Sequence, residues 1–211
     1  MLAGDKTNRI CNWSEKPIVV PREPGARSDF AQNAAVAAEE RIGLCQDTGL
    51  AVFFVELGEE VRFDKTEGLR SLGQAITDGM ASGYGEGCLR KSVVADPLRR
   101  VNTGDNAPAF IHWEVVPGDA LKVSFMAKGG GAENWSAVRM FTPAAGPDSI
   151  EDFVTATVDA AGASACPPLV VGVGIGGNFE GVTLLSKQAL LRKPLGTPHP
   201  DPFYAKMEHR L

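Results

Sequence analysis

The sequence predicts a mixed fold, α+β or α/β, in which a mixed sheet with hairpins packs against helices. Two segments rich in strand formers, AFIHWEVV at 109–116 and ALKVSFM at 120–126, flank Pro117, Gly118 and Asp119, and this turn sequence favours a hairpin. Apolar residues elsewhere recur every three or four positions, which is the helical period. Helices and strands do not alternate regularly along the chain, so a doubly wound parallel sheet is not expected.

The first half of the chain is predicted to contain an arm, two helices and a buried strand. Residues 1–27 are polar and interrupted by prolines, so we expect an extended or poorly ordered N-terminal arm. An alanine-rich helix is predicted over 28–43, and the apolar spacing predicts a second over 68–82, which the sequence GYGEG should end. The apolar run at 50–57 is typical of a buried strand, with 61–63 as a possible hairpin partner.

The second half is predicted to contain two further helices around a strand. Ser149 and Asp152 resemble a capping box that begins a helix. The segment 169–177 is typical of a strand that runs into a glycine turn, and 180–192 is expected to be the helix beyond it. The tail over 193–202 contains four prolines, and no regular element is assigned to it.

Composition excludes several classes of protein. The chain has 211 residues, of which 44% are hydrophobic and 22% charged, as in an ordinary globular protein. Its net charge of −5 argues against nucleic-acid binding, which requires a basic surface. No apolar run approaches the roughly 18 residues that a membrane span needs, and no signal-like segment is recognised at the start. We therefore expect a cytoplasmic protein that does not bind membranes.

The four cysteines are widely spaced. Cys11, Cys45, Cys88 and Cys166 form no C-x-x-C pair, which excludes a zinc ribbon or a thioredoxin motif. Free thiols and scattered ligands of a metal cluster both remain open. Cys45 and Cys166 each lie beside a structural breakpoint in polar or glycine-rich company, whereas an inert core cysteine usually lies within an apolar run.

Two glycine clusters bear on function. Gly172, Gly174 and Gly177 match a G-x-G-x-x-G pattern, but no acidic residue follows about 20 positions later, so a tight strand-to-helix packing turn is favoured over a dinucleotide site. In KGGGAEN at 128–134, consecutive glycines expose backbone amides toward a carboxylate or a developing negative charge, or form a flexible hairpin end. Both interpretations of this second cluster stay open.

Four motifs occur in an order that resembles one enzyme family. They are CQDTG at 45–49, LRKSVVADPLRRVNTGDNAPA at 89–109, KGGGAEN at 128–134 and CPPLVVGVGIGG at 166–177. In this order they resemble the α-type part of class I fumarate hydratases and L-tartrate dehydratases, which are iron–sulfur hydro-lyases. The resemblance covers residues 28–211, which we interpret as an α-type catalytic domain shortened at its C-terminus.

The resemblance implies a [4Fe-4S] cluster held by three cysteine thiolates, with one iron open to bind substrate as a Lewis acid. Cys45 and Cys166 match two of the three ligands. The third family cysteine lies in a later segment that these 211 residues do not include. Either the chain is a shortened subunit, or the third ligand comes from another segment or partner.

The resemblance also implies roles at the substrate. Gln46 and Asp47 would line the substrate, with Asp47 also a candidate for proton transfer, and Arg90 would bind a carboxylate through its planar fork of donors. Gly130 and Gly131 would contact the substrate through their backbone. In two-subunit members a β-type polypeptide supplies further catalytic groups, so we expect a β-type subunit or domain as partner, a homo-oligomer and a site at an interface.

The leading functional hypothesis is that the chain is the α subunit of a class I fumarate hydratase, which interconverts fumarate and malate. The alternative is the α subunit of an L-tartrate dehydratase, whose small dicarboxylate substrate differs by one hydroxyl. A non-catalytic, shortened family member is a further reading, and a nicotinamide oxidoreductase rests only on the glycine turn.

Overall fold

The computed structural model describes residues 11–13, 17–18, 26–42, 45, 47–63, 71–166, 169–192 and 197–211. The chain divides into two compact units. We call residues 23–133 the sheet unit, and residues 1–22 together with 134–211 the helical unit.

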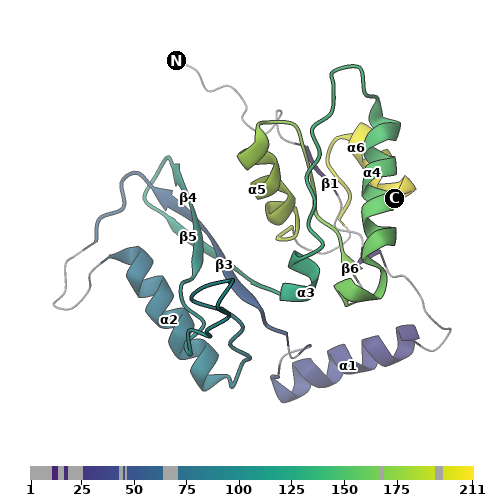
Figure 1. Ribbon diagram of the computed structural model, residues 1–211. Helices are drawn as coiled ribbons and strands as arrows, with labels where there is room; N and C mark the ends of the chain where they lie inside the picture. Colours follow the sequence, from purple (N-terminus) through teal and green to yellow (C-terminus); the bar gives the residue numbers. More distant parts are fainter. Residues whose placement is uncertain are drawn as a thin grey trace. The chain divides into compact units, whose positions relative to one another are not determined.

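The sheet unit is built on a three-stranded mixed sheet (Figure 1). Its central strand is β3 (Leu50–Gly58), which pairs in parallel with β4 (Phe110–Val116) and antiparallel with β5 (Leu121–Lys128). The centre of β3 is buried, with Ala51, Val52 and Val55 at most 1% exposed. Both the mixed fold class and the buried strand predicted over 50–57 are confirmed.

The hairpin predicted from 109–126 is wrong, because β3 lies between the two strands that the turn connects. The turn crosses the end of β3: Gly58 N–H donates to Ala120 O at 2.8 Å and Glu59 N–H donates to Val116 O at 2.9 Å. A Cβ on Gly58 would lie 2.4 Å from Gly118 O, so only glycine fits under this crossing. The expected partner strand at 61–63 is also absent, since these described residues form no strand.

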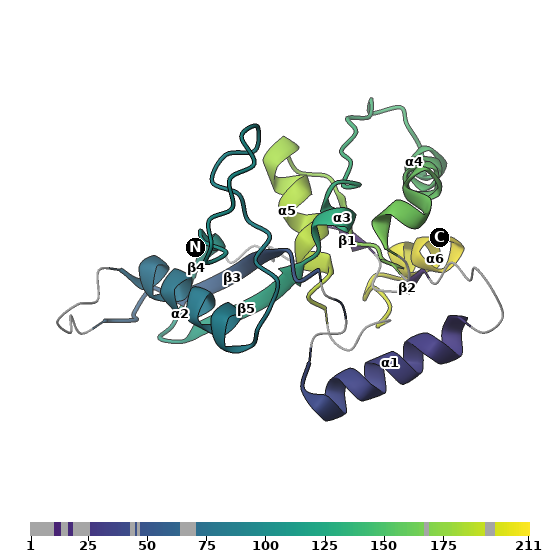
Figure 2. The same ribbon diagram turned by 60° about the horizontal axis from the view of Figure 1, so that its bottom comes forward.

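Helix α2 (Leu72–Glu86) connects the parallel strands β3 and β4, which need a crossover. It lies along the sheet in both views (Figures 1 and 2), and Met80 and Tyr84 pack against Ala51 of β3. Ser71 caps its N-terminus by accepting a hydrogen bond from Gln74 N–H at 3.1 Å. The GYGEG sequence does not end this helix where expected, because Gly83 to Glu86 form its last turn.

The sheet unit also contains α1 (Ala26–Glu40), which corresponds to the helix predicted over 28–43. A further element is the single helical turn α3 (Gly130–Glu133). Helix α3 directly follows β5 and is made from the predicted glycine cluster. The helix prediction for α1 is therefore confirmed, with its boundaries shifted by two or three residues.

The described residues of the helical unit form short strand pairs and three α-helices. Two antiparallel pairs form between segments far apart in the sequence. Its elements are β1 (Cys11–Trp13) paired with β7 (Val173–Ile175), β2 (Pro17–Ile18) paired with β6 (Leu169–Val170), α4 (Pro147–Ala161), the 3-10 turn η2 (Gly162–Ala165), α5 (Phe179–Ala189) and α6 (Pro202–Arg210). Within the predicted arm, 11–13 and 17–18 are thus extended strands.

In the helical unit, one expectation is wrong, one is supported, and one helix was not predicted. The capping box is wrong: Gly146 caps α4 without a side-chain bond, and Pro147 begins the helix. Helix α6 was not expected, although Asp201 and Pro202 are a usual N-cap and first residue, and Asp201 accepts from Phe203 N–H at 2.8 Å. The glycine turn before α5 packs closely against that helix, which supports the packing turn that the sequence analysis favoured over a dinucleotide site.

No helix in the described part of the chain is long and apolar enough to cross a membrane.

Replacing Gly174 with alanine should destabilise the helical unit. An alanine Cβ there would lie 2.3 Å from Val182 O on α5, so the strand and helix would have to separate. We expect a loss of about 2 kcal/mol or more in the free energy of unfolding. Gly79→Ala is the control, because Gly79 is an exposed position of α2 with nothing within 4 Å of its Cβ, and it should stabilise by up to about 1 kcal/mol. Equal effects of the two substitutions in urea unfolding would contradict the packing role.

Candidate functional site

The candidate site lies in the sheet unit, where the segment before β3 meets the segment after β5. Asp47 accepts hydrogen bonds at one carboxylate oxygen, Oδ2, from Gly130 N–H at 3.0 Å and Gly131 N–H at 3.4 Å. The glycine cluster therefore turns its amides toward a carboxylate, which was one of the two interpretations left open. That carboxylate belongs to the chain itself.

A glycine at position 49 makes this approach possible. Leu50 pairs with Lys128 in the antiparallel register, so the start of β3 and the end of β5 share one edge of the sheet. Gly49 adopts φ +51°, and a Cβ on it would lie 2.0 Å from Lys128 O. A Cβ on Gly129 would lie 3.5 Å from Asp47 Oδ2. The backbones thus meet closely at Gly49, whereas Gly129 leaves ordinary contact distance to the Asp47 carboxylate.

The segment that carries Arg90 is tied to the same place. Thr48 Oγ1 donates a hydrogen bond to Arg90 O at 2.9 Å, which joins the residue after Asp47 to the backbone of Arg90. The Arg90 side chain itself is exposed. The structure therefore brings together Asp47, Gly130, Gly131 and the Arg90 backbone.

Tyr84 is a site residue that the sequence reading missed. It is 2% exposed, and its hydroxyl donates a hydrogen bond to Thr48 O at 3.0 Å. Burial raises the pKa of this phenol above its usual 10.0, and the nearby Asp47 carboxylate raises it further. Tyr84 is therefore a neutral donor that holds the backbone beside Asp47. Its sequence context, GYGEG, indicates only the end of a helix.

An ion pair closes the glycine turn. Lys128 Nζ lies 3.4 Å from Glu133 Oε2, and the two side chains are 13% and 25% exposed. They flank the three glycines on either side, so the pair links the end of β5 to the end of α3. This partly buried pair favours the turn that presents the two amides.

The comparisons with known proteins identify the family. The family model described as fumarate hydratase (Fumerase) matches residues 21–211. A Methanocaldococcus jannaschii protein, provisionally named an L(+)-tartrate dehydratase subunit alpha, is 37% identical over 186 residues, which is 85% of this chain and 63% of the relative. The L(+)-tartrate dehydratase subunits alpha of Escherichia coli strains UTI89 and K12 are 35% and 34% identical, over 79% of this chain and 54% of each relative.

The chain belongs to the iron–sulfur hydro-lyase α-subunit family of class I fumarate hydratases and tartrate dehydratases. It spans between 54 and 63% of the length of these three curated relatives.

The two cysteines predicted as ligands of the hydro-lyase cluster lie in different units. Cys45 is exposed in the sheet unit, and its Sγ accepts a hydrogen bond from Asp47 N–H at 3.4 Å. Cys166 is exposed in the helical unit, with φ +59° after η2. Gln46 lies outside the described residues. That both thiolates bind one cluster stays a prediction, and no group of three or more metal-binding side chains occurs in the described part of the chain.

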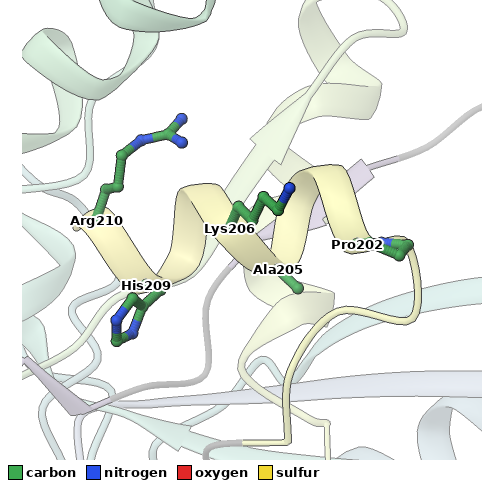
Figure 3. Close-up of a pocket in the computed structure, with 5 residues that line it drawn as sticks. All are labelled: Pro202, Ala205, Lys206, His209 and Arg210. Carbon is green, nitrogen blue, oxygen red and sulfur yellow. The ribbon is translucent and has the colours of Figure 1, made fainter.

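The helical unit has a surface pocket that is lined by none of the candidate site residues. Figure 3 shows that its five lining residues come from α6. They are Pro202, Ala205, Lys206, His209 and Arg210. The Arg210 guanidinium also forms an ion pair with Glu151 of α4. None of the residues that match the family's functional positions lines this pocket.

Tyr84 should ionise only above pH 10. The Tyr204→Phe variant leaves Tyr84 as the chain's single tyrosine, so its phenolate absorbance can be followed alone. Because the pKa is raised in the folded state, the phenol stabilises the fold fully below pH 10, and this contribution is lost as the pH rises through the folded-state pKa. Circular dichroism, recorded in parallel, shows where the fold persists. Ionisation at or below pH 10 in the folded protein would contradict the buried donor role.

Proposed function

We propose that this chain is the α-type part of an iron–sulfur hydro-lyase that removes water from a small 2-hydroxy dicarboxylate, with L-tartrate favoured as substrate. The observation that carries the proposal is the placement of Asp47: two glycine amides donate to its carboxylate, and its backbone N–H donates to the Cys45 sulfur. Dehydration requires a group that transfers a proton close to a centre that activates the hydroxyl.

The choice of tartrate rests on the relatives. The curated relatives described above carry the name L(+)-tartrate dehydratase subunit alpha, which supports the alternative hypothesis better than fumarate hydration. Malate lacks one hydroxyl of tartrate. A site that hydrogen-bonds this hydroxyl rejects the analogue without it, because its own polar groups are then left unpaired.

Cys45 fits a cluster ligand in its chemistry, because an exposed sulfur that accepts a backbone N–H bond is suited to carry thiolate charge. Cys45 and Cys166 would supply two of the thiolates that hold a [4Fe-4S] cluster. When bound, the cluster would provide an open iron that binds the substrate hydroxyl as a Lewis acid.

The chain's own residues would then bind and orient. Arg90 would form paired hydrogen bonds with a substrate carboxylate, and its exposed guanidinium is accessible for this. Asp47, held by its hydrogen bonds, would move a proton at its carboxylate oxygens. The family pattern also implies substrate contacts at Gln46 and at the backbone of Gly130 and Gly131, although the amides of these two glycines donate to Asp47 in this structure.

We also propose that the chain works with a β-type partner and as part of a homo-oligomer. The relatives are named subunits alpha, which supports an assembly. Large apolar side chains of β4 and β5 are exposed: Trp113 at 46%, Val115 at 67%, Val123 at 45% and Phe125 at 49%. Exposed apolar patches of this kind are typical of interaction surfaces.

The test is turnover by the chain co-expressed with its β-type partner and reconstituted anaerobically with iron and sulfide. We expect kcat/KM for L-tartrate to exceed that for L-malate by about 100-fold or more, because of the unpaired polar groups that malate leaves. A reversed preference would return the assignment to fumarate hydration. Absence of turnover with both substrates would refute the proposed activity.

Arg90→Lys should lower kcat/KM by about 10- to 100-fold, because lysine keeps the charge but loses the paired hydrogen bonds, which are worth about 1.5–3 kcal/mol with a charged acceptor. Arg99→Lys is the matched control, since Arg99 is an exposed arginine nearby in the sequence. Thermal unfolding should be unchanged in both variants. Equal kcat/KM for Arg90→Lys and wild type would remove Arg90 from the substrate site.

A further inference from the structure

Asn106 is a fully buried polar residue that the proposed mechanism does not use. Its side chain is 0% exposed and makes three hydrogen bonds to backbone groups. Nδ2 donates to Gly49 O at 3.1 Å, and Oδ1 accepts from Ser92 N–H at 2.8 Å and from Val93 N–H at 3.0 Å. A carboxamide can donate and accept at the same time, so one side chain binds two separate segments.

These two segments carry the residues of the candidate site. Gly49 lies two positions after Asp47, and Ser92 lies two positions after Arg90. The bond to Gly49 spans 57 positions of sequence, whereas the bonds to the other segment span 13 and 14. Asn106 therefore links the backbone beside the candidate proton-transfer group to the backbone beside the candidate carboxylate binder.

The link is reinforced on the side of Asp47. Thr48 donates to Arg90 O, and Tyr84 donates to Thr48 O, so the residue between Asp47 and Gly49 is also held. Gly49 in turn packs against the Lys128 carbonyl, next to the glycines whose amides bind Asp47. A shift of Gly49 would therefore move Asp47 relative both to these amides and to Arg90.

We propose that Asn106 is a positioning residue, whose buried carboxamide holds the Asp47–Gly49 segment in register with the Arg90 segment. The inference rests on the proposed function for its effect on catalysis, but the register itself is a property of the chain. Interactions that fix the relative position of two groups act mainly in the transition state, so their loss lowers kcat more than it raises KM.

Asn106→Asp keeps the size of the side chain and one acceptor for the amides of Ser92 and Val93, but places an acceptor against Gly49 O. Thr48→Val removes the neighbouring link to Arg90 O with a side chain of the same shape, and serves if the first variant fails to fold. Val55→Ala is the control for loss of stability, because Val55 is 1% exposed in the centre of β3 and makes none of these links.

Hydrogen–deuterium exchange on the full chain tests the register without substrate. We call Asn106→Asp and Thr48→Val the linking variants. Both should increase exchange of the Gly130 and Gly131 amides by about 10-fold or more relative to the rest of the sheet unit. Val55→Ala should raise exchange throughout the unit, with no selective change at these amides. Exchange at Gly130 and Gly131 that follows the rest of the unit in Thr48→Val and in any folded Asn106→Asp would overturn the proposal.

Kinetics of the reconstituted complex separate this inference from the proposed function. We expect the linking variants to lower kcat by about 10- to 100-fold with KM changed less than about 3-fold, while Val55→Ala retains the wild-type values. An active wild type together with linking variants whose kcat is unchanged overturns the positioning role. An inactive wild type refutes the proposed function alone, because the exchange measurement still decides the register.

Discussion

The candidate site depends on the close approach of two backbones at the edge of the mixed sheet. The antiparallel pairing of β3 with β5 places Gly49 against Lys128, and a Cβ at Gly49 would lie 2.0 Å from the Lys128 carbonyl oxygen. Any other residue would separate the strands at this point. Because the backbones meet here, Asp47, which lies two positions before Gly49, reaches the amides that follow β5. The hydrogen bonds to Asp47, the ion pair across α3 and the links to the Arg90 segment all follow from this approach.

Much of the fold follows from local patterns in the sequence, because helical period and apolar runs are local properties. The helices α2, α4 and α5 and the buried strand β3 were all predictable in this way. The order of the strands was not predictable, because a turn sequence specifies that the chain reverses direction but not that the two strands it connects lie side by side. β3 therefore occupies the place where a hairpin partner was expected. Helix α6 was not predicted: the four prolines over 193–202 gave no helical signal, although a proline at the first position, as Pro202 is here, begins a helix.

The site was predictable where a residue type carries its chemistry in a motif, and not where its role depends on distant contacts. Asp47 was named through the resemblance of its motif to the hydro-lyase family, and the glycine cluster indicated exposed amides or a flexible hairpin end. Tyr84 binds a carbonyl 36 positions away, and Asn106 binds one 57 positions away. Nothing in the sequence around either residue specifies these partners. Their importance becomes visible only when burial and hydrogen bonds are considered together, because a buried polar group must find a partner and thereby fixes the position of that partner.

The hydrogen bonds of the glycine amides determine whether a substrate carboxylate can bind to them in the presence of the Asp47 carboxylate. Gly130 and Gly131 already donate to the Asp47 carboxylate, so a substrate carboxylate could use these amides only by displacing Asp47. Displacement would leave Asp47 beside Tyr84, whose neutral hydroxyl is committed to the Thr48 carbonyl. No such change is needed if the amides orient Asp47, and in the proposed function the guanidinium of Arg90 would then provide the positive charge for the substrate carboxylate. Fixed backbone dipoles that hold a proton-transfer group cost no reorganisation during the reaction, which favours this division of roles.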